Sequence, residues 1–337
     1  MQKSISSRHI LIIGGAGYIG SVLSRQLLQN NYQVRVLDPL IYNNSRSLAE
    51  LWTDDRFSFI HGDMGNTDTL NQALEGITDV VLLAALVGDP ICKKYPELAQ
   101  KVNDDYPKRL LNTLQGRGIQ KFVFSSTCSN YGLQKDDTPA DETAELNPQS
   151  LYAEAKVGFE KHILEQKTNL DFSPVILRIA TAFGISPRMR FDLTISQFTR
   201  ELALGHKLLV YDENTWRPYC HILDISRAII RVIESPAEKV SGEVFNVGGD
   251  EGNFTKKMVV DLIQRELPNT EFEYHVGDFD PRNYRVNFQK IKNQLGFVPE
   301  YSVEKSVKTL IKALKQGFFT DVDENRNFYG NYFIDDM

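Results

Sequence analysis

The stretch Ile10-Leu11-Ile12-Ile13-Gly14-Gly15-Ala16-Gly17-Tyr18-Ile19-Gly20 decides the fold of this chain. Four apolar residues run into the pattern Gly-x-x-Gly-x-x-Gly, and apolar residues at helical spacing follow it. A short apolar run that closes on glycine is typical of a buried parallel strand, and the 3.6-residue period after it indicates a helix. The sequence therefore predicts a strand, a tight turn and a helix.

The three glycines have separate tasks in such a turn. Gly14 permits the tight turn, Gly17 lets the backbone approach a pyrophosphate, and Gly20 lets the helix pack closely on the strand. The helix start at Tyr18 and Ile19 offers unpaired N–H groups and a partial positive charge to phosphates. We therefore expect these five residues to bind a dinucleotide.

Glycine turns also close ordinary strand–helix units, so the next strand is needed to decide whether this turn binds a dinucleotide or is only structural. Val34-Arg35-Val36-Leu37 ends at Asp38, at the spacing expected of a ribose-binding acid. The Asp38 carboxylate can accept both adenosine ribose hydroxyls and would repel a 2′-phosphate. No arginine follows immediately, so we expect NAD rather than NADP.

Composition limits the class of protein. The chain has 337 residues, 24% of them charged and 42% hydrophobic, which is ordinary for a soluble enzyme with a large core. The net charge of −6 argues against nucleic acid as the main partner. No apolar segment has the length of a signal peptide or a membrane span, and the three scattered cysteines do not form a disulfide pattern. We expect a cytoplasmic protein without a metal site.

Further apolar runs alternate with helical patterns. Such alternation predicts an α/β fold with a doubly wound parallel sheet of Rossmann type. Asp63 and Met64 follow the third strand, and Ala84 and Ala85 follow the fourth, at the edge where such sheets bind ligands. The predicted strands are 57–60, 79–83, 121–124 and 174–178, and the predicted helices include 48–52, 96–114 and 151–167.

The alternation of strands and helices breaks after residue 179. We expect residues 1–179, together with 219–248, to form the NAD-binding domain. Residues 180–218 and 249–316 would form a smaller substrate-binding lobe. The acidic and aromatic tail 317–337 either packs on the body or contacts a partner, and the sequence leaves both open.

Tyr152 and Lys156 stand four residues apart on a predicted helix, so both side chains share one face. A lysine ammonium near a phenol stabilises the phenolate and lowers the tyrosine pKa, which would make Tyr152 a general base. Thr127 supplies a hydroxyl at the end of the preceding strand. The alternative is a solvated helix face.

These residues together resemble the extended short-chain dehydrogenase/reductase family, in its nucleotide-sugar epimerase/dehydratase branch. The resemblance rests on the glycine turn, Asp38, Asp63, Ser125-Ser126-Thr127, Tyr152-x-x-x-Lys156 and Arg178. It implies that Tyr152 is the catalytic base, that Lys156 activates it and binds the nicotinamide ribose, and that Thr127 binds the sugar C4 oxygen. It also implies that Asn103, Ala84, Ala85 and Ser125 line NAD.

The same resemblance narrows the reaction. Its first step oxidises the sugar C4 hydroxyl to a ketone. The 4,6-dehydratases that this chain resembles carry Asp-Glu directly after the catalytic threonine, whereas Cys128-Ser129 stands here. C4 epimerisation and simple C4 oxidation remain open, because residues 84–90 and 178–190 resemble a subgroup that includes GDP-heptose C4-dehydrogenases. A typical hexose 4-epimerase has Asn near Thr181.

Arginines in the second half suit a nucleoside diphosphate, because a guanidinium binds phosphate oxygens in pairs. Arg217 matches the family arginine on the pyrophosphate, and Arg282 or Arg285 stands near the second. Arg188 and Arg190, with Val87 and Thr181, are further candidates for the substrate site. Surface ion pairs are the alternative for each arginine.

Two further expectations concern the whole protein. Some proteins of this fold only bind NAD(H) to sense redox state or act as scaffolds, but they lack the tyrosine or lysine that this chain keeps. The family also implies a homodimer, in which the helices at 96–114 and 151–167 pack against their copies.

Overall fold

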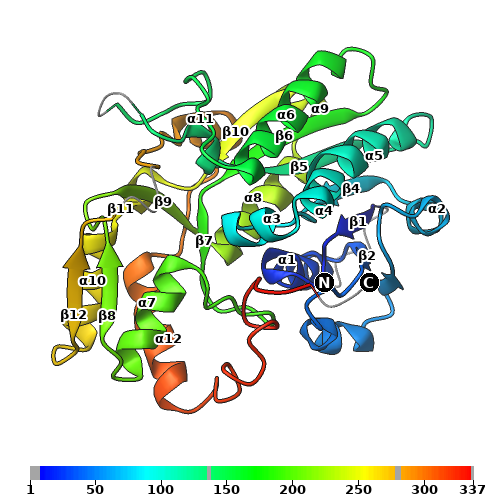
Figure 1. The fold of residues 1–337 in the computed structure, drawn as a ribbon. Helices are drawn as coiled ribbons and strands as arrows, with labels where there is room; N and C mark the ends of the chain where they lie inside the picture. Colours follow the sequence, from blue (N-terminus) through cyan, green and yellow to red (C-terminus); the bar gives the residue numbers. More distant parts are fainter. Residues whose placement is uncertain (1–7, 135–137, 278–281, 335–337) are drawn as a thin grey trace.

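The computed structural model describes residues 8–134, 138–277 and 282–334. Its centre is a seven-stranded sheet in the order β10-β6-β5-β4-β1-β2-β3, and all neighbouring strands run parallel (Figure 1). The strands 3-2-1-4-5-6 follow the Rossmann order, which confirms the predicted fold class. The strands are β1 (His9–Ile13), β2 (Gln33–Asp38), β3 (Phe57–His61), β4 (Asp79–Leu82), β5 (Lys121–Thr127), β6 (Ser173–Ile179) and β10 (Glu243–Val247).

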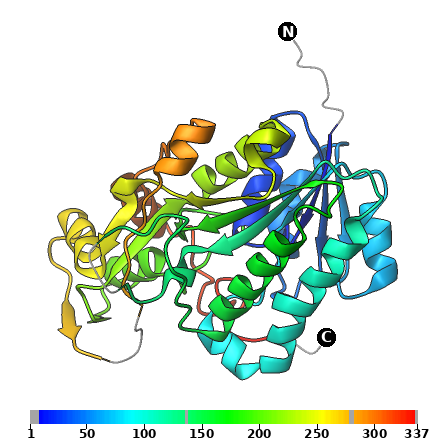
Figure 2. The same ribbon diagram turned by 90° about the horizontal axis from the view of Figure 1, so that it is seen from above.

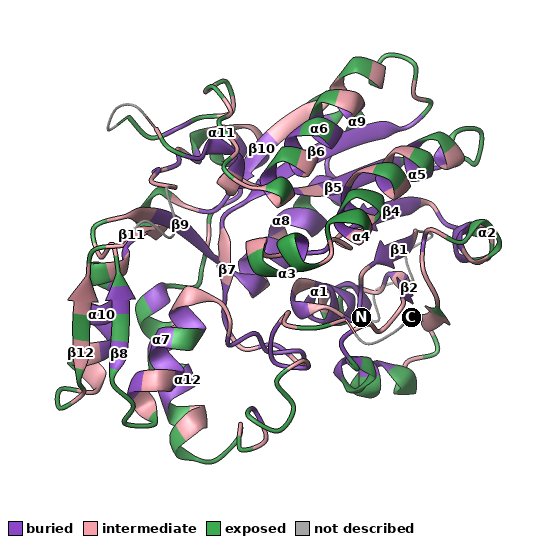
Figure 3. Ribbon diagram, viewed as in Figure 1, coloured by how far each residue is buried: buried purple, intermediate pink, exposed green. Residues whose placement is uncertain are grey.

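Strand β1 is buried on both faces, as its unbroken apolar run predicts. Ile10 and Ile12 join one apolar core with α1 (Tyr18–Gln29) and α8 (Ile222–Glu234). Leu11 and Ile13 join the opposite core with α2 (Thr67–Leu74), α5 (Tyr106–Leu114) and α6 (Leu151–Gln166). Figure 3 shows the buried central strands between helices that expose one side.

The predicted helix 96–114 is interrupted. It consists of α4 (Pro96–Gln100), a π-helical turn η2 (Lys101–Asp105) and α5, and a short helix α3 (Asp89–Lys94) precedes it. Pro107 has no N–H to donate to the carbonyl of residue 103, so the hydrogen-bond ladder of a regular α-helix cannot continue there. The predicted helix 48–52 is a 3₁₀ segment, η1 (Ser45–Thr53).

A second region lies beside the large sheet (Figure 2). It holds a three-stranded sheet, β11-β9-β7, and a parallel pair, β12-β8. Their apolar side chains share one core with three helices. The elements are β7 (Thr181–Phe183), β8 (Leu208–Tyr211), β9 (Trp216–His221), β11 (Asn253–Thr255), β12 (Phe272–His275), α7 (Thr194–Ala203), α10 (Lys256–Glu266) and α12 (Val303–Lys315).

The chain crosses between the two regions more than once. After β9 it returns as α8, which covers the large sheet, and β10 then pairs with β6. Short elements complete the connections, namely η3 (Cys128–Tyr131), α9 (Ala237–Val240), η4 (Asp250–Gly252) and α11 (Gln289–Leu295). No helix in the described ranges is long and apolar enough to cross a membrane.

Up to residue 334 the C-terminal tail packs on the body of the protein, which was one of the two alternatives that the sequence left open. Figure 1 shows it in red, leaving α12 and running back toward α1. Phe328 and Tyr329 are buried in an apolar cluster with Tyr18 and Val22 of α1.

Candidate active site

The glycine-rich turn leaves no room for side chains at its critical points. Gly14 has φ of +87°, and a Cβ there would lie 2.6 Å from the main-chain nitrogen of Ala84. A Cβ on Gly20 would lie 2.4 Å from the carbonyl oxygen of Gly14. Helix α1 begins after Gly17 without a side-chain cap, so its first N–H groups are available to an anion. This geometry fits a dinucleotide pyrophosphate.

Asp38 is buried at the end of β2 and is held in place by the turn. Its carboxylate accepts hydrogen bonds from the main-chain N–H groups of Ala16, at 3.0 Å, and Leu40, at 2.9 Å. Burial raises the pKa of Asp38, and these two N–H donors oppose that effect. The Asn44 side chain also hydrogen-bonds this carboxylate, which has four lone pairs and can still accept from a ribose hydroxyl.

Two residues of this corner were missed by the sequence analysis. Asn44 donates to the carbonyl of Ala16 at 2.8 Å, and Ser47 donates to the same oxygen at 2.8 Å. Both side chains are buried, and the Oδ1 atom of Asn44 has no hydrogen-bond partner in the described part of the chain. The polar run Asn43-Asn44-Ser45 after an apolar strand was the available signal.

The other predicted cofactor residues line the same edge of the sheet. Met64 is buried after β3, and the carboxylate of Asp63 accepts a hydrogen bond from the N–H of Gly65. Asn103 lies in the π-helical turn, with both ends of its amide bonded to the main chain of Leu86 at 2.8 and 3.0 Å. Asn103 therefore holds the loop that carries Ala84 and Ala85.

Helix α6 presents Tyr152 and Lys156 to the end of β5. The Ser150 side chain caps the helix by accepting a hydrogen bond from Ala153 N–H at 3.3 Å. The Lys156 ammonium donates to the carbonyl of Ser125 at 2.8 Å, and its nitrogen lies 5.7 Å from the ring centroid of Tyr152. The predicted pair therefore shares one face at the sheet edge.

The expected lowering of the tyrosine pKa is opposed by the surroundings of Tyr152. Burial raises the pKa of Tyr152, and the neighbouring Cys92 and Asp89 raise it further, while Arg190 opposes them. Burial also lowers the pKa of Lys156 to about 7, which Glu160 opposes. Desolvation of two buried groups outweighs the attraction that the sequence analysis considered.

Thr127 ends β5 and caps the next turn. Its Oγ1 accepts a hydrogen bond from Ser129 N–H at 3.1 Å, so the hydroxyl hydrogen remains available to donate. The neighbouring Cys128 thiol is buried, donates to the carbonyl of Arg178 at 3.2 Å and has a pKa raised by burial. The residue after Thr127 is therefore not an acid at neutral pH.

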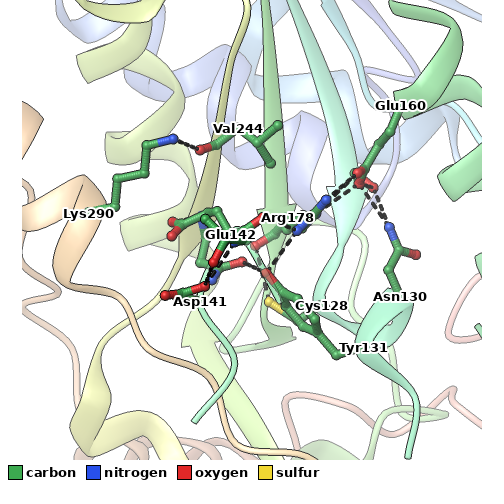
Figure 4. A network of polar contacts seen from close by, with 12 residues as sticks. Cys128, Asn130, Tyr131, Asp141, Glu142, Glu160, Arg178, Val244 and Lys290 are labelled. Carbon is green, nitrogen blue, oxygen red and sulfur yellow. Dashed lines mark hydrogen bonds and ion pairs between the residues drawn. The ribbon is translucent and has the colours of Figure 1, made fainter. Parts of the chain in front are cut away.

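A buried ion pair between β6 and α6 lies next to the end of β5 (Figure 4). Arg178 binds Glu160 with nitrogen–oxygen distances of 2.8 and 3.1 Å. Glu160 also accepts hydrogen bonds from Ser126 and Asn130, and Arg178 donates to the hydroxyl of Tyr131 at 3.0 Å. The network ties α6, β5 and β6 together, through Ser126 next to Thr127 and Glu160 one helix turn after Lys156.

Arg188 and Arg190 lie in the loop after β7, and both are buried and bonded to other residues of the protein. Arg190 forms a two-fold pair with Asp192 at 2.9 and 2.5 Å. The Arg188 side chain is buried against the C-terminal tail, where it donates to Asn331 at 2.8 Å. Arg188 also stacks on Tyr42, with its guanidinium carbon 4.5 Å from the ring centroid.

Arg217 and Arg282 come together at the other side of the site. Arg217 is buried in β9 and donates to the carbonyl oxygen of Arg282. Arg282 in turn lies 3.6 Å from Asp89 of α3. Arg285 stacks on Trp216 instead, at 5.3 Å. Thr181 begins β7, half-buried, and Val87 lies in the loop after β4.

Comparison with known proteins decides the family. The sequence model of the NAD dependent epimerase/dehydratase family matches residues 10–248 of this chain. The chain belongs to this family. It is similar to UDP-glucose 4-epimerase of Corynebacterium glutamicum, at 28% identity over 87% of this chain and 91% of that protein. It is also similar to UDP-glucose 4-epimerase of Lacticaseibacillus casei, at 29% identity over 89% and 95% of the two chains.

Solved structures agree with this family. UDP-glucuronic acid 4-epimerase from Bacillus cereus, in complex with UDP-glucuronic acid and NAD, has a TM-score of 0.82 at 25% identity. That match covers 91% of this chain and 99% of the other. The dTDP-glucose 4,6-dehydratase from Bacillus anthracis, in complex with NAD, has a TM-score of 0.80 at 25% identity and covers 93% and 98%. The protein is therefore an NAD-dependent nucleotide-sugar enzyme, and its glycine turn and Asp38 fit that cofactor.

Proposed function

We propose that this protein is a nucleotide-sugar 4-epimerase that acts on a UDP-sugar. The proposal is carried by Tyr152, Lys156 and Thr127 at one sheet edge, with no acidic residue directly after Thr127. The UDP-glucose and UDP-glucuronic acid 4-epimerases among its relatives supply the substrate class.

Each of the three side chains has a role at the sugar C4 atom. Tyr152 takes the proton of the C4 hydroxyl, Thr127 donates a hydrogen bond to the C4 oxygen, and Lys156 holds the nicotinamide ribose and stabilises the phenolate. NAD would supply the hydride acceptor and donor at C4 when it is bound. For epimerisation the site must let the 4-keto sugar present its other face, and Tyr152 then returns the proton to the C4 oxygen.

The smaller region would hold the nucleotide. We propose that residues 180–218 and 249–316 form the substrate lobe on the domain 1–179 and 219–248. In this assignment Arg217 and Arg282 bind the pyrophosphate of the sugar nucleotide, and Thr181 and Val87 face the sugar. The pairing of Arg282 with Asp89 supports this, because it links the second region to α3 beside Tyr152.

The experiment is to incubate the purified protein separately with UDP-glucose, UDP-galactose, UDP-glucuronic acid and UDP-arabinose. The expected product is the C4 epimer, without accumulation of NADH. A released 4-keto sugar with stoichiometric NADH would instead identify a C4 dehydrogenase, and a 4-keto-6-deoxy sugar a dehydratase. Absence of turnover with these UDP-sugars, and with GDP-, dTDP- and CDP-sugars tested in the same way, would leave a protein that only binds NAD(H).

We also propose a cytoplasmic homodimer. The three cysteines are free and buried, as suits a reducing compartment. The dimer would pair α5 and α6 with their copies. The exposed residues of η2 and α5 are polar, among them Lys101, Asp105 and Arg109, so sedimentation at micromolar concentration is the deciding measurement.

A further inference from the structure

The C-terminal tail is anchored beside the segment that follows β2. Asp321 forms an ion pair with Arg46 at 3.0 Å. The Arg46 guanidinium also lies 3.6 Å from the ring centroid of Phe328. Phe328 and Tyr329 pack on Tyr18, at the start of α1. The first anchor of the tail therefore lies on the adenosine side of the predicted cofactor site.

The end of the tail is anchored beside the segment that follows β4. Asn331 donates to the carbonyl of Val87 at 3.1 Å, and the Lys94 ammonium lies 4.2 Å from the ring centroid of Phe333. Ile334 packs on an apolar cluster that includes Leu86. Strand β1 lies between β2 and β4 in the sheet. A segment fixed to the loops after both neighbours passes the carboxyl end of β1, where the glycine turn begins.

Arg188 is held against this crossing segment. Its Nη2 donates to the Gly330 carbonyl at 3.2 Å and to the Asn331 side chain at 2.8 Å. The residue is only 3% exposed, yet its Nε has no hydrogen-bond partner within the described ranges. A buried donor without an acceptor is costly, and a guanidinium suits phosphate oxygens. Arg188 also lowers the pKa of Asp38 through its charge, a smaller effect than burial, which raises it.

We propose that residues 327–334 form a strap across the bound dinucleotide, and that Arg188 is a ligand of the cofactor's pyrophosphate. Arg188 was predicted above as a substrate residue, and this assignment replaces that one. Asn331 is the central tie, because its side chain bonds both Arg188 and Val87 and its N–H donates to Asp192 at 3.3 Å. The strap keeps NAD on the enzyme between turnovers. The inference rests on NAD binding and not on the identity of the sugar.

The first test is the dissociation rate of NAD from the full-length protein, followed by exchange with a fluorescent NAD analogue. Asn331→Ala loses both side-chain bonds, so NAD should dissociate at least about tenfold faster and bind correspondingly more weakly. Asn331→Asp keeps an acceptor for Arg188 but loses the donor to Val87, so NAD should dissociate from it faster than from the wild type and more slowly than from Asn331→Ala. Glu324→Gln changes an exposed tail residue and should match the wild type.

The second test separates a phosphate ligand from a structural arginine. Arg188→Met should weaken NAD binding at least about tenfold while adenosine, which has no phosphate, binds as before. Arg188→Lys should recover part of the loss. Equal losses for NAD and adenosine would overturn the phosphate role.

A tail that occupied the cofactor site would give the opposite result from a strap. Asn331→Ala would then bind NAD more tightly than the wild type, which overturns the proposal, as would an unchanged dissociation rate. Thermal unfolding of each variant shows that it is folded. These measurements need no sugar, so failure of the epimerase assay would not affect them.

Discussion

The Lys156 ammonium donates a 2.8 Å hydrogen bond to the main-chain carbonyl of Ser125, and this bond joins α6 to the end of β5. It fixes the helix turn that carries Tyr152 beside the strand that ends at Thr127. The bond also takes up one donor of a lysine that is only 2% exposed. The position of Tyr152 and the charge of Lys156 are therefore linked, and each gives a prediction.

Tyr152→Phe removes one hydroxyl from a packed side chain. We expect C4 oxidation to fall by about a hundred- to ten-thousand-fold, as is typical when a general base is lost. NAD binding and the unfolding temperature should stay near those of the wild type. Thr127→Val should be milder, because it removes one orienting hydrogen bond and keeps the shape. Near-normal sugar oxidation by Tyr152→Phe would disprove the mechanism and leave the NAD site intact.

Lys156→Met should change how stability depends on pH. Burial lowers the pKa of Lys156 to about 7 from 10.5, so between these values the unfolded chain binds one more proton than the folded chain. Stability of the NAD-free wild type should therefore rise with pH in this window, by up to about 1.4 kcal/mol per pH unit from this group. Below pH 7 the contribution of Lys156 should level off.

The measurement is the free energy of unfolding in urea at several pH values from 7 to 10. The difference between the wild type and Lys156→Met isolates this group, because the other titrating groups are common to both. Lys161→Met changes an exposed lysine of the same helix and should leave the pH dependence unaltered. A difference that does not vary with pH would show that Lys156 stays charged in the folded protein.

Glu160→Gln should destabilise the fold. The change leaves the buried Arg178 guanidinium without its charged partner, which typically costs about 3–5 kcal/mol. Chemical denaturation measures the loss, and Glu154→Gln, exposed on the same helix, is the matched control. The double variant Glu160→Leu/Arg178→Met should lose less than Glu160→Gln alone, because no charge remains buried. If Glu160→Gln unfolds at the wild-type midpoint, the pair contributes no net stability.

The sequence predicted the parts of this protein that depend on neighbouring residues. The run from Ile10 to Gly20 contains its own strand, turn and helix start, and Tyr152 and Lys156 meet because one helix turn separates them. The prediction of one continuous helix over 96–114 was wrong in part. The periodicity of the apolar residues does not show that Pro107 interrupts the main-chain hydrogen bonds of the helix.

Contacts between distant residues could not be predicted in this way. Asn331 lies 244 positions from Val87, and no local pattern relates the two. The raised pKa of Tyr152 and the lowered pKa of Lys156 also depend on burial, which comes from the packing of other elements. The basic loop predicted Arg188 as a substrate residue, and its hydrogen bonds to Gly330 and Asn331 of the distant tail could not be predicted from that loop.

Arg217 gives the last prediction. Its guanidinium is buried, donates to the carbonyl of Arg282 and lies 5.4 Å from the ring centroid of Tyr284. Arg217→Lys keeps the charge but loses the planar fork that binds two phosphate oxygens. We expect KM for the sugar nucleotide to rise about ten- to a hundredfold with a smaller change in kcat, as loss of charge-assisted bonds implies.

Arg285→Lys is the matched control for Arg217→Lys. The Arg285 guanidinium carbon lies 5.3 Å from the ring centroid of Trp216, the residue next to Arg217. Initial rates over a range of substrate concentrations, with NAD saturating, separate KM from kcat. If Arg285→Lys raises KM and Arg217→Lys does not, the two arginines exchange roles, since the Arg285 guanidinium lies over Trp216, the residue that precedes Arg217 in β9.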